Sequence, residues 1–282
     1  SQAGRFDFTL RRLNINKTKL TMSFLAAFLF VITCATAGQA SAQRTFVAGP
    51  GIGNDSNTAS DCSFSAPCRN FSAAYTVTNT GGEIIALSPG VGYGALTITH
   101  AITVTGLPGQ VAFVAVAAGT TGFTVAAGAS ELVVVQNITF NGSGAGSNTG
   151  LSHTSGKLVV KNCVFSQLAT GLSVTNTKMD LISSDFYNNG TGVSASGTGT
   201  DGQLANIPVT MVRIALGNVI GNTVGLKMLS PGTNFANIWF FGYGAQVATP
   251  NVVGNTAGEQ QCTPGCTTIQ NIPTFGPNTI LP

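Results

Sequence analysis

A short motif recurs six times between residues 122 and 247, and this repetition restricts the chain to a fold that stacks similar units. Each copy is a glycine followed by a brief apolar alternation; the glycines are Gly122, Gly150, Gly171, Gly192, Gly225 and Gly244. The steps between them are 28, 21, 21, 33 and 19 residues. A second apolar segment precedes each glycine, for example residues 132–135 and 158–160. Self-similarity at about 20–30 residues, with strands in every unit, is typical of a stacked β solenoid.

The composition also favours short strands joined by tight turns. The 282 residues include 36 glycines, 43% are apolar and only 7% are charged. Abundant Thr, Ser, Asn and Val favour strands and turns over amphipathic helices. The large apolar share and small net charge argue against a disordered chain. Since a solenoid grows by adding coils, residues 43–282 are expected to form one domain.

The first 42 residues are predicted to be an export signal. Basic residues precede residue 22, an apolar run follows at residues 24–37, and Ala40-Ser41-Ala42 supplies a small-x-small cleavage site. Met22 is an alternative start, but it would remove every basic residue from this leader. The run is shorter than the roughly 20 residues that span a membrane, so we expect no span after cleavage. The protein is therefore expected outside the cell, in a periplasm or on the cell surface.

The charge that remains after cleavage excludes one class of partner. From Gln43 onward, three Arg and four Lys face five Asp and three Glu, a net charge of −1. A chain with no basic excess has no electrostatic attraction for nucleic acid.

The cysteines are spaced for local disulfides. Cys62 and Cys68 flank one short loop, and Cys262 and Cys266 flank another. In an oxidising compartment each pair is expected to be bonded. A zinc site would need four ligands, and only the two histidines remain to complete one, so we expect no metal site. Cys163 is left unpaired among apolar neighbours, which favours a buried thiol.

The segment at residues 71–106 resembles a known family. A two-turn helix is expected from residue 71, before Gly81-Gly82, and is followed by Glu83-Ile-Ile-Ala-Leu-Ser-Pro-Gly, Tyr93 and two Ile-Thr strands. With the Cys62–Cys68 loop before it, this arrangement resembles the N-terminal cap and first coil of the pectin-lyase-like superfamily, and in particular small secreted bacterial members. The resemblance covers about residues 44–248.

This resemblance implies an all-β fold, a single-stranded right-handed parallel β-helix with a short N-terminal capping helix. We expect the cap at residues 43–82, about eight or nine coils at 83–248, and a tail at 249–282 that covers the open edge of the last coil. The superfamily includes lyases, hydrolases, epimerases, adhesins and inactive coils, so the resemblance does not imply one function.

The repeats predict which side chains face inward. In one coil these are Leu158, Val160, Asn162 and Phe165, with counterparts in the neighbouring coils. Coils stack about 4.8 Å apart, so Asn137 and Asn162 are expected to stack inside the solenoid and satisfy each other's amides.

Candidate catalytic residues are few. The superfamily's lyases hold calcium with carboxylates and use Arg or Lys as the base, and its hydrolases use clustered Asp. The weak candidates here are Asp180, Asp185, Asp201 and Arg213. Aligning the coils gives neither of the first two a neighbouring carboxylate; the expected neighbours are Val159 and Thr210 for Asp180, and Val164 and Ala215 for Asp185. Arg213 is expected beside Ser183.

Neither His100 nor His153 adjoins a nucleophile motif, so no catalytic dyad is expected. The scarcity of paired carboxylates favours a non-catalytic extracellular scaffold or glycan-binding module without a cofactor. A polysaccharide lyase or glycoside hydrolase on the lateral face is the alternative, and a lyase would add calcium.

One flank of the solenoid is a candidate ligand site. Lys157 and Lys178 are expected one above the other, with Lys161 and Asp180 nearby, between inserts at residues 141–148 and 198–206. An extracellular polysaccharide or another cell-surface component would be the partner. The alternative is a solvated face that keeps the chain soluble and protects its edges. Trp239 and Tyr243 are a second candidate for sugar contact, with core packing as the alternative. No oligomeric state follows from the sequence.

Intact-mass measurement on protein from its native host tests the predictions about processing and disulfides. The mass is expected to begin at Gln43 and to fall by two hydrogens for each bridge. Titration of the unfolded, unreduced protein should then find one thiol, Cys163. A higher thiol count would contradict the proposed pairing.

Overall fold

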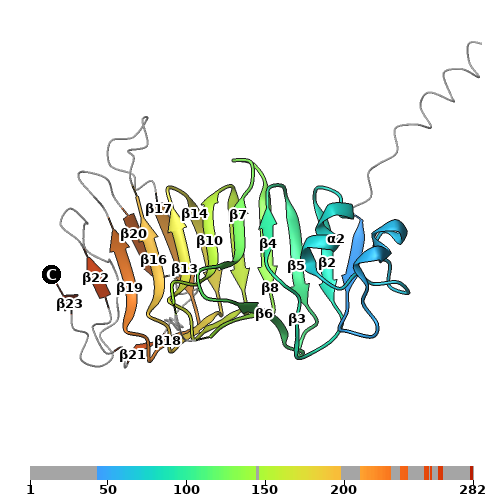
Figure 1. Cartoon of the computed structure of the whole chain (residues 1–282). Coiled ribbons are helices and arrows are strands. Elements are labelled where there is room, and N and C mark those ends of the chain that lie inside the picture. Colours follow the sequence, from blue (N-terminus) through green and yellow to red (C-terminus); the bar gives the residue numbers. More distant parts are fainter. Residues whose placement is uncertain are drawn as a thin grey trace, which may run out of the picture. The chain divides into compact units, whose positions relative to one another are not determined.

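The computed structural model describes residues 43–143, 146–197, 210–229, 236–240, 251–253, 255, 260–262 and 280–281, all within one compact unit, Ala42–Pro282. These residues form a solenoid of three parallel sheets, and Figure 1 shows the strands of successive coils side by side. The predicted β-helix-like architecture is therefore confirmed. The export signal at residues 1–42 lies outside the described residues.

From β2 to β22, each coil contributes one strand to each of three sheets, in the order A, B, C, and β1 and β23 add a further strand to sheets A and C. Sheet A contains β1 (Arg44–Val47), β2 (Gly82–Ala86), β5 (Ile102–Gly106), β8 (Leu132–Gln136), β11 (Lys157–Lys161), β14 (Lys178–Ile182), β17 (Thr210–Ala215) and β20 (Ala236–Phe240). Sheet B contains β3 (Val91–Gly92), β6 (Ala112–Val116), β9 (Ile138–Gly142), β12 (Val164–Ser166), β15 (Asp185–Tyr187), β18 (Asn218–Ile220) and β21 (Asn251–Val253). Sheet C contains β4 (Leu96–Ile98), β7 (Thr121–Ala126), β10 (Thr149–Ser155), β13 (Thr170–Thr175), β16 (Thr191–Ser196), β19 (Val224–Leu229), β22 (Gln260–Cys262) and β23 (Ile280–Leu281).

Strand pairing continues beyond the point where we expected the coils to end. β21 pairs with β18, β22 with β19 and β23 with β22, all in parallel. Pairing requires backbone N–H and C=O groups, and an open edge offers them to any segment that can lie along it. A tail without apolar alternation can therefore still extend the sheets.

The N-terminal elements include the predicted helix, which is confirmed as α2 (Phe71–Val77). A short 3-10 helix, η1 (Asp55–Ser60), precedes it. The disulfide between Cys62 and Cys68 is formed. The side chains of the predicted second pair, Cys262 and Cys266, lie outside the described residues.

Stacked aromatic rings form the centre of the core. The rings of Phe140 and Phe165 lie parallel with centroids 4.8 Å apart, and Phe165 and Phe186 repeat this arrangement at 4.7 Å. The in-register pairing of β9, β12 and β15 places the same side chain one coil above the last. Pairs of this kind add about 0.5–1.5 kcal/mol beyond the area that they bury.

The recurring glycine is explained by lack of space beside these rings. A Cβ at Gly171 would lie 2.6 Å from the Gly192 carbonyl oxygen and 2.7 Å from Cδ1 of Phe186. At Gly150 the corresponding distances are 2.6 Å to the Gly171 oxygen and 2.8 Å to Phe165. Any side chain here would push apart two coils or displace a buried ring, so the repeat retains glycine.

Asn137 and Asn162 stack at a turn and are hydrogen-bonded to each other, as expected, but the prediction that they face inward is wrong. Both residues adopt left-handed backbone conformations, with φ of 57° and 51°, at the turn between sheets A and B. Asn162 is exposed, and its Nδ2 donates to Asn137 Oδ1 at 3.4 Å. Asn tolerates positive φ better than most residues, so here it serves the turn and not the interior.

A buried asparagine ladder lies instead at the turn between sheets B and C. It contains Asn189 and Asn222, both buried, and continues to Asn255. Asn189 Nδ2 donates to the Phe165 oxygen at 3.0 Å and to Asn222 Oδ1 at 2.9 Å, and its Oδ1 accepts from the Leu168 N–H at 3.0 Å. Buried turn amides are thus satisfied from coil to coil.

Replacing Asn189 with Ala is expected to lower the free energy of unfolding by about 1–3 kcal/mol, because the Leu168 N–H loses its buried partner. Chemical denaturation would measure the loss. Asn79→Ala is the matched control, since Asn79 is exposed and lies outside the ladder. Equal stabilities for the two variants would contradict the structural role given to the ladder.

Candidate functional site

The predicted lysine flank lies on the outer face of sheet A. Lys157, Lys161 and Lys178 are all exposed. Leu158 pairs with Met179, which places Lys157 beside Lys178, as the alignment of coils predicted. Neither of the two salt bridges in the described residues involves these lysines. This face also has an exposed apolar side chain, Leu132, which pairs with Lys157.

Asp180 and Arg213 form an ion pair on this face. Asp180 pairs with Val159 on one side, as expected, but with Arg213 on the other. The expected neighbours, Thr210 for Asp180 and Ser183 for Arg213, are therefore wrong by three residues. The segment between β16 and β17 is longer than the turns of the other coils. Because the coils on its two sides were aligned without the correct length for this segment, the predicted register is shifted. The Asp180 carboxylate and the Arg213 guanidinium, the candidate lyase base, are therefore bound to each other.

Asp185 lies in sheet B and has a separate role. Its register neighbour in the next coil is Asn218, and not Ala215 as expected, because Phe186 pairs with Val219. Its Oδ1 accepts from the Asn218 backbone N–H at 2.9 Å and from Asn218 Nδ2 at 2.8 Å. Val164 is its other neighbour, as predicted. Asp180 and Asp185 are thus on different sheets, and each is held by the next coil.

The remaining candidates are not described at side-chain level. Trp239 lies in β20, where its backbone pairs with that of Arg213, but its side chain is outside the described residues. Asp201 and Tyr243 lie wholly outside them. Within the described part of the chain, no group of three or more His, Cys, Asp or Glu residues is placed to hold a metal ion.

The connectivity of the coils corrects the predicted borders of the lysine flank. Residues 143–148 connect β9 in sheet B to β10 in sheet C, so this insert does not border sheet A. Residues 197–209 connect β16 in sheet C to β17 in sheet A. Both inserts are therefore connected to strands of sheet C: one precedes β10 and the other follows β16.

Sheet C presents two rows of hydroxyl groups, which we call the hydroxyl ladders. Strand register places the same position of successive coils side by side. The first ladder is Thr97, Thr124, Ser152, Ser173 and Ser194; the second is Thr121, Thr149, Thr170 and Thr191. None of the nine is buried, whereas the two residues that separate the ladders on each strand, such as Gly122 and Phe123, are buried.

We did not predict these ladders from the sequence, although it contains a signal for them. A Thr directly precedes four of the recurring glycines, and a Ser or Thr follows two residues after each of the same four. The pattern is visible only when the residues that flank the glycine are compared between coils.

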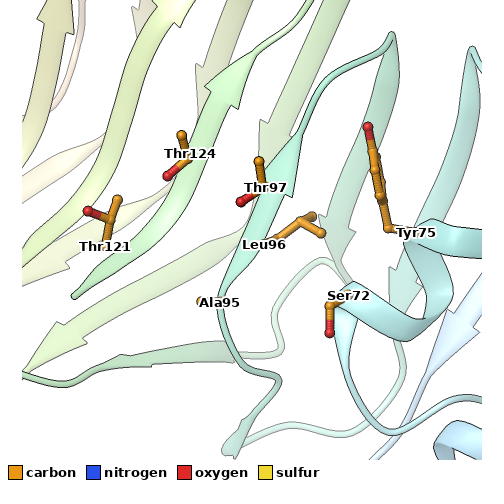
Figure 2. A pocket seen from close by; sticks show the side chains of 7 residues that line it. All are labelled: Ser72, Tyr75, Ala95, Leu96, Thr97, Thr121 and Thr124. Atoms are coloured by element: carbon orange, nitrogen blue, oxygen red, sulfur yellow. The ribbon is translucent and has the colours of Figure 1, made fainter.

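A pocket lies where the ladders meet α2. It has a volume of about 290 Å³ and is lined by Ser72 and Tyr75 of α2, by Thr97 and the residues before it, and by Thr121 and Thr124 of β7. Figure 2 shows Thr97 and Thr124 side by side on neighbouring strands, with the helix beside them. The Tyr75 ring stacks on His100 with centroids 4.4 Å apart. The Tyr75 hydroxyl accepts from the Thr99 N–H at 2.8 Å.

His153 faces the interior, in register with Val125 and Val174. Burial lowers the pKa of its imidazole from 6.5 to about 4, which keeps the ring neutral. Its Nε2 lies 3.4 Å from the Lys178 carbonyl oxygen. Cys163 is also buried, and burial raises the pKa of its thiol to about 12. Both groups therefore lie in the core.

Comparison with known proteins adds no assignment. A scan against protein-family models, a search of curated proteins and a search of solved structures found no match. Among the described helices, none has the length and apolar character required to cross a bilayer.

Protonation of His153 is expected to make stability depend on pH. Because its pKa is lower in the folded than in the unfolded protein, the unfolded state takes up the proton first as pH falls below 6.5. The neutral state of His153 thus contributes up to about 3 kcal/mol to the free energy of unfolding. This contribution is complete above pH 6.5 and is lost as pH falls towards 4. The His153→Val variant carries the residue found at this position in both neighbouring coils. Between pH 7.5 and pH 4.5, chemical denaturation should show that this variant loses less free energy of unfolding than the native protein. Identical losses in both proteins would contradict this assignment.

Proposed function

We propose that the protein is an exported, right-handed parallel β-helix of the pectin-lyase-like type that acts as a non-catalytic glycan-binding module or extracellular scaffold. The observation that carries the proposal is the separation of the candidate catalytic groups. Cleavage of a glycosidic bond by paired carboxylates requires both to flank one bond. Asp180 is ion-paired with Arg213 on sheet A, while Asp185 accepts hydrogen bonds from Asn218 in sheet B.

The packing of α2 supports the proposed N-terminal cap. Phe71 is buried, and its ring lies 5.1 Å from that of Tyr93 and 5.6 Å from that of Phe123, between centroids. Phe123 in turn contacts Phe140, the first ring of the parallel stack. The helix therefore contributes the aromatic ring at the N-terminal end of the core, where a capping element is needed to exclude water.

Repetition of the outer faces supports binding as the activity. A solenoid presents one position many times along a lateral face, so weak contacts with an extended polymer add together. The lysines of sheet A supply exposed positive charge for an acidic chain, whereas sheet C supplies neutral hydroxyl groups. The extracellular setting expected from the leader makes polysaccharide the proposed partner.

The alternative is a polysaccharide lyase or glycoside hydrolase that acts on the lateral face. Asp201 belongs to the segment that enters sheet A at β17, the strand that contains Arg213. This connectivity is the reason to keep the alternative.

One screen separates the two functions. Acidic and neutral glycans are incubated with the protein with and without calcium, and binding, unsaturated-product absorbance and reducing ends are measured. We expect binding without turnover, and Asp180→Ala should leave binding within about twofold because its carboxylate is already paired with Arg213.

The control is Glu83→Ala, which removes another ion-paired carboxylate on the same sheet, at the Arg44–Glu83 pair. Turnover that persists in this control but disappears in Asp180→Ala or Asp185→Ala would establish an enzyme and overturn the proposal. Failure to bind any glycan would contradict the glycan-binding role and leave only the scaffold.

The lysine flank has its own test within the same screen. Replacing Lys157, Lys161 and Lys178 with Ala should abolish binding of polygalacturonate if this face holds acidic chains. The melting temperature should change little, because these side chains are exposed. Unchanged binding of polygalacturonate by the triple variant would assign the lysines to solubility alone.

A further inference from the structure

We infer that the outer face of sheet C, with the pocket beside α2, binds an extended neutral polysaccharide. This inference rests on the proposed function and adds the surface and the class of glycan. Its elements are the two hydroxyl ladders and the Tyr75 ring, which together line a continuous face from the pocket to β16.

The hydroxyl groups of the ladders are free to bind a ligand. Within the described residues, none of the nine side-chain hydroxyls makes an intramolecular hydrogen bond. Nearby hydroxyls differ: Thr154 donates to the Val125 oxygen and Ser155 donates to the Ala127 oxygen at 2.9 Å. Each free hydroxyl offers one donor and two acceptor positions, which is also the chemistry of a sugar hydroxyl.

The ladders are preorganised by the solenoid. Parallel strands repeat at about 4.8 Å, and side chains on one face of a sheet keep that spacing. Beneath them the buried residues Phe123, Leu151 and Leu172 are in register and fix the backbone. Thr also has restricted side-chain rotation, so little conformational entropy is lost on binding. A polymer with regularly repeated hydroxyls would meet the same group in every coil.

The charge of this face selects a neutral chain. The strands β4, β7, β10, β13 and β16 contain no Asp, Glu, Lys or Arg. The first charged residue along the ladder is Lys227, which pairs with Ser194. A uronic acid chain would therefore lose hydration of its carboxylates without gaining a cation, which is costly. Neutral sugars carry no such penalty.

The pocket supplies the aromatic contact that sugars use. Thr97, Thr121 and Thr124 belong both to the ladders and to the pocket lining, so the pocket is the end of the face and not a separate site. Tyr75 is held there by His100, whose Nδ1 lies 2.7 Å from the Tyr75 hydroxyl. A fixed aromatic ring beside polar hydroxyls matches the apolar faces and polar edges of a pyranose.

The test uses mixed-linkage β-glucan as the neutral probe and polygalacturonate as the acidic one, with affinity electrophoresis and calorimetry. The ladder variant is Thr124→Val, Ser152→Ala and Ser173→Ala combined, which removes three hydroxyls and keeps the shape of the strands. Its affinity for β-glucan should fall by about 100-fold, because three hydrogen bonds of about 1 kcal/mol each are lost. Its melting temperature should stay close to that of the native protein, since these hydroxyls make no internal bonds.

The matched control is the triple lysine variant of sheet A, which should bind β-glucan as the native protein does. Unchanged β-glucan binding by the folded ladder variant, or loss of it in the lysine variant, would overturn the choice of face. Binding of polygalacturonate alone would overturn the neutral ligand but leave the proposed function intact. If the native protein binds neither polymer, sheet C is not a glycan site and the glycan-binding role fails with it.

Discussion

Successive backbones approach each other closely at the recurring glycines, and this close approach governs how the coils stack. At Gly171 the next coil's carbonyl and the Phe186 ring occupy the space that a Cβ would need. This contact keeps the coils in register and lets Phe140, Phe165 and Phe186 stack face to face. Backbone hydrogen bonding and aromatic packing therefore favour the same distance between successive coils. Each coil buries its apolar side chains only by packing against its neighbours.

Because every coil repeats the last, a buried polar group must be satisfied in every coil as well. The asparagine ladder of Asn189 and Asn222 meets this requirement at the turn between sheets B and C, where amide groups bond the backbone of adjacent coils. The regular step from one coil to the next also places equivalent residues side by side on the outside of sheet C, where the hydroxyls of Thr and Ser form rows. A structural necessity inside and a binding surface outside thus have a common geometric origin.

The three sheets differ in what they present to solvent. Sheet A has exposed lysines and the Asp180–Arg213 pair, sheet B has Asp185 engaged with Asn218, and sheet C is uncharged from β4 to β16. The carboxylates are used for contacts between coils, where each stabilises its neighbour. In our proposal this division leaves sheet C for recognition of a neutral polymer through many similar weak contacts.

The solenoid could be predicted without coordinates, because glycines and apolar alternation repeat at a period that stacked coils satisfy. The sequence also predicted α2, the Cys62–Cys68 disulfide and the pairing of Lys157 beside Lys178. The register across the long insert could not be predicted in this way, and the folded coils place Arg213, not Thr210, against Asp180. The structure also shows that Asn162 faces outward and that both inserts adjoin sheet C. Periodicity specifies which residues face inward on a strand, whereas turn conformation and insert length determine how one coil is placed against the next.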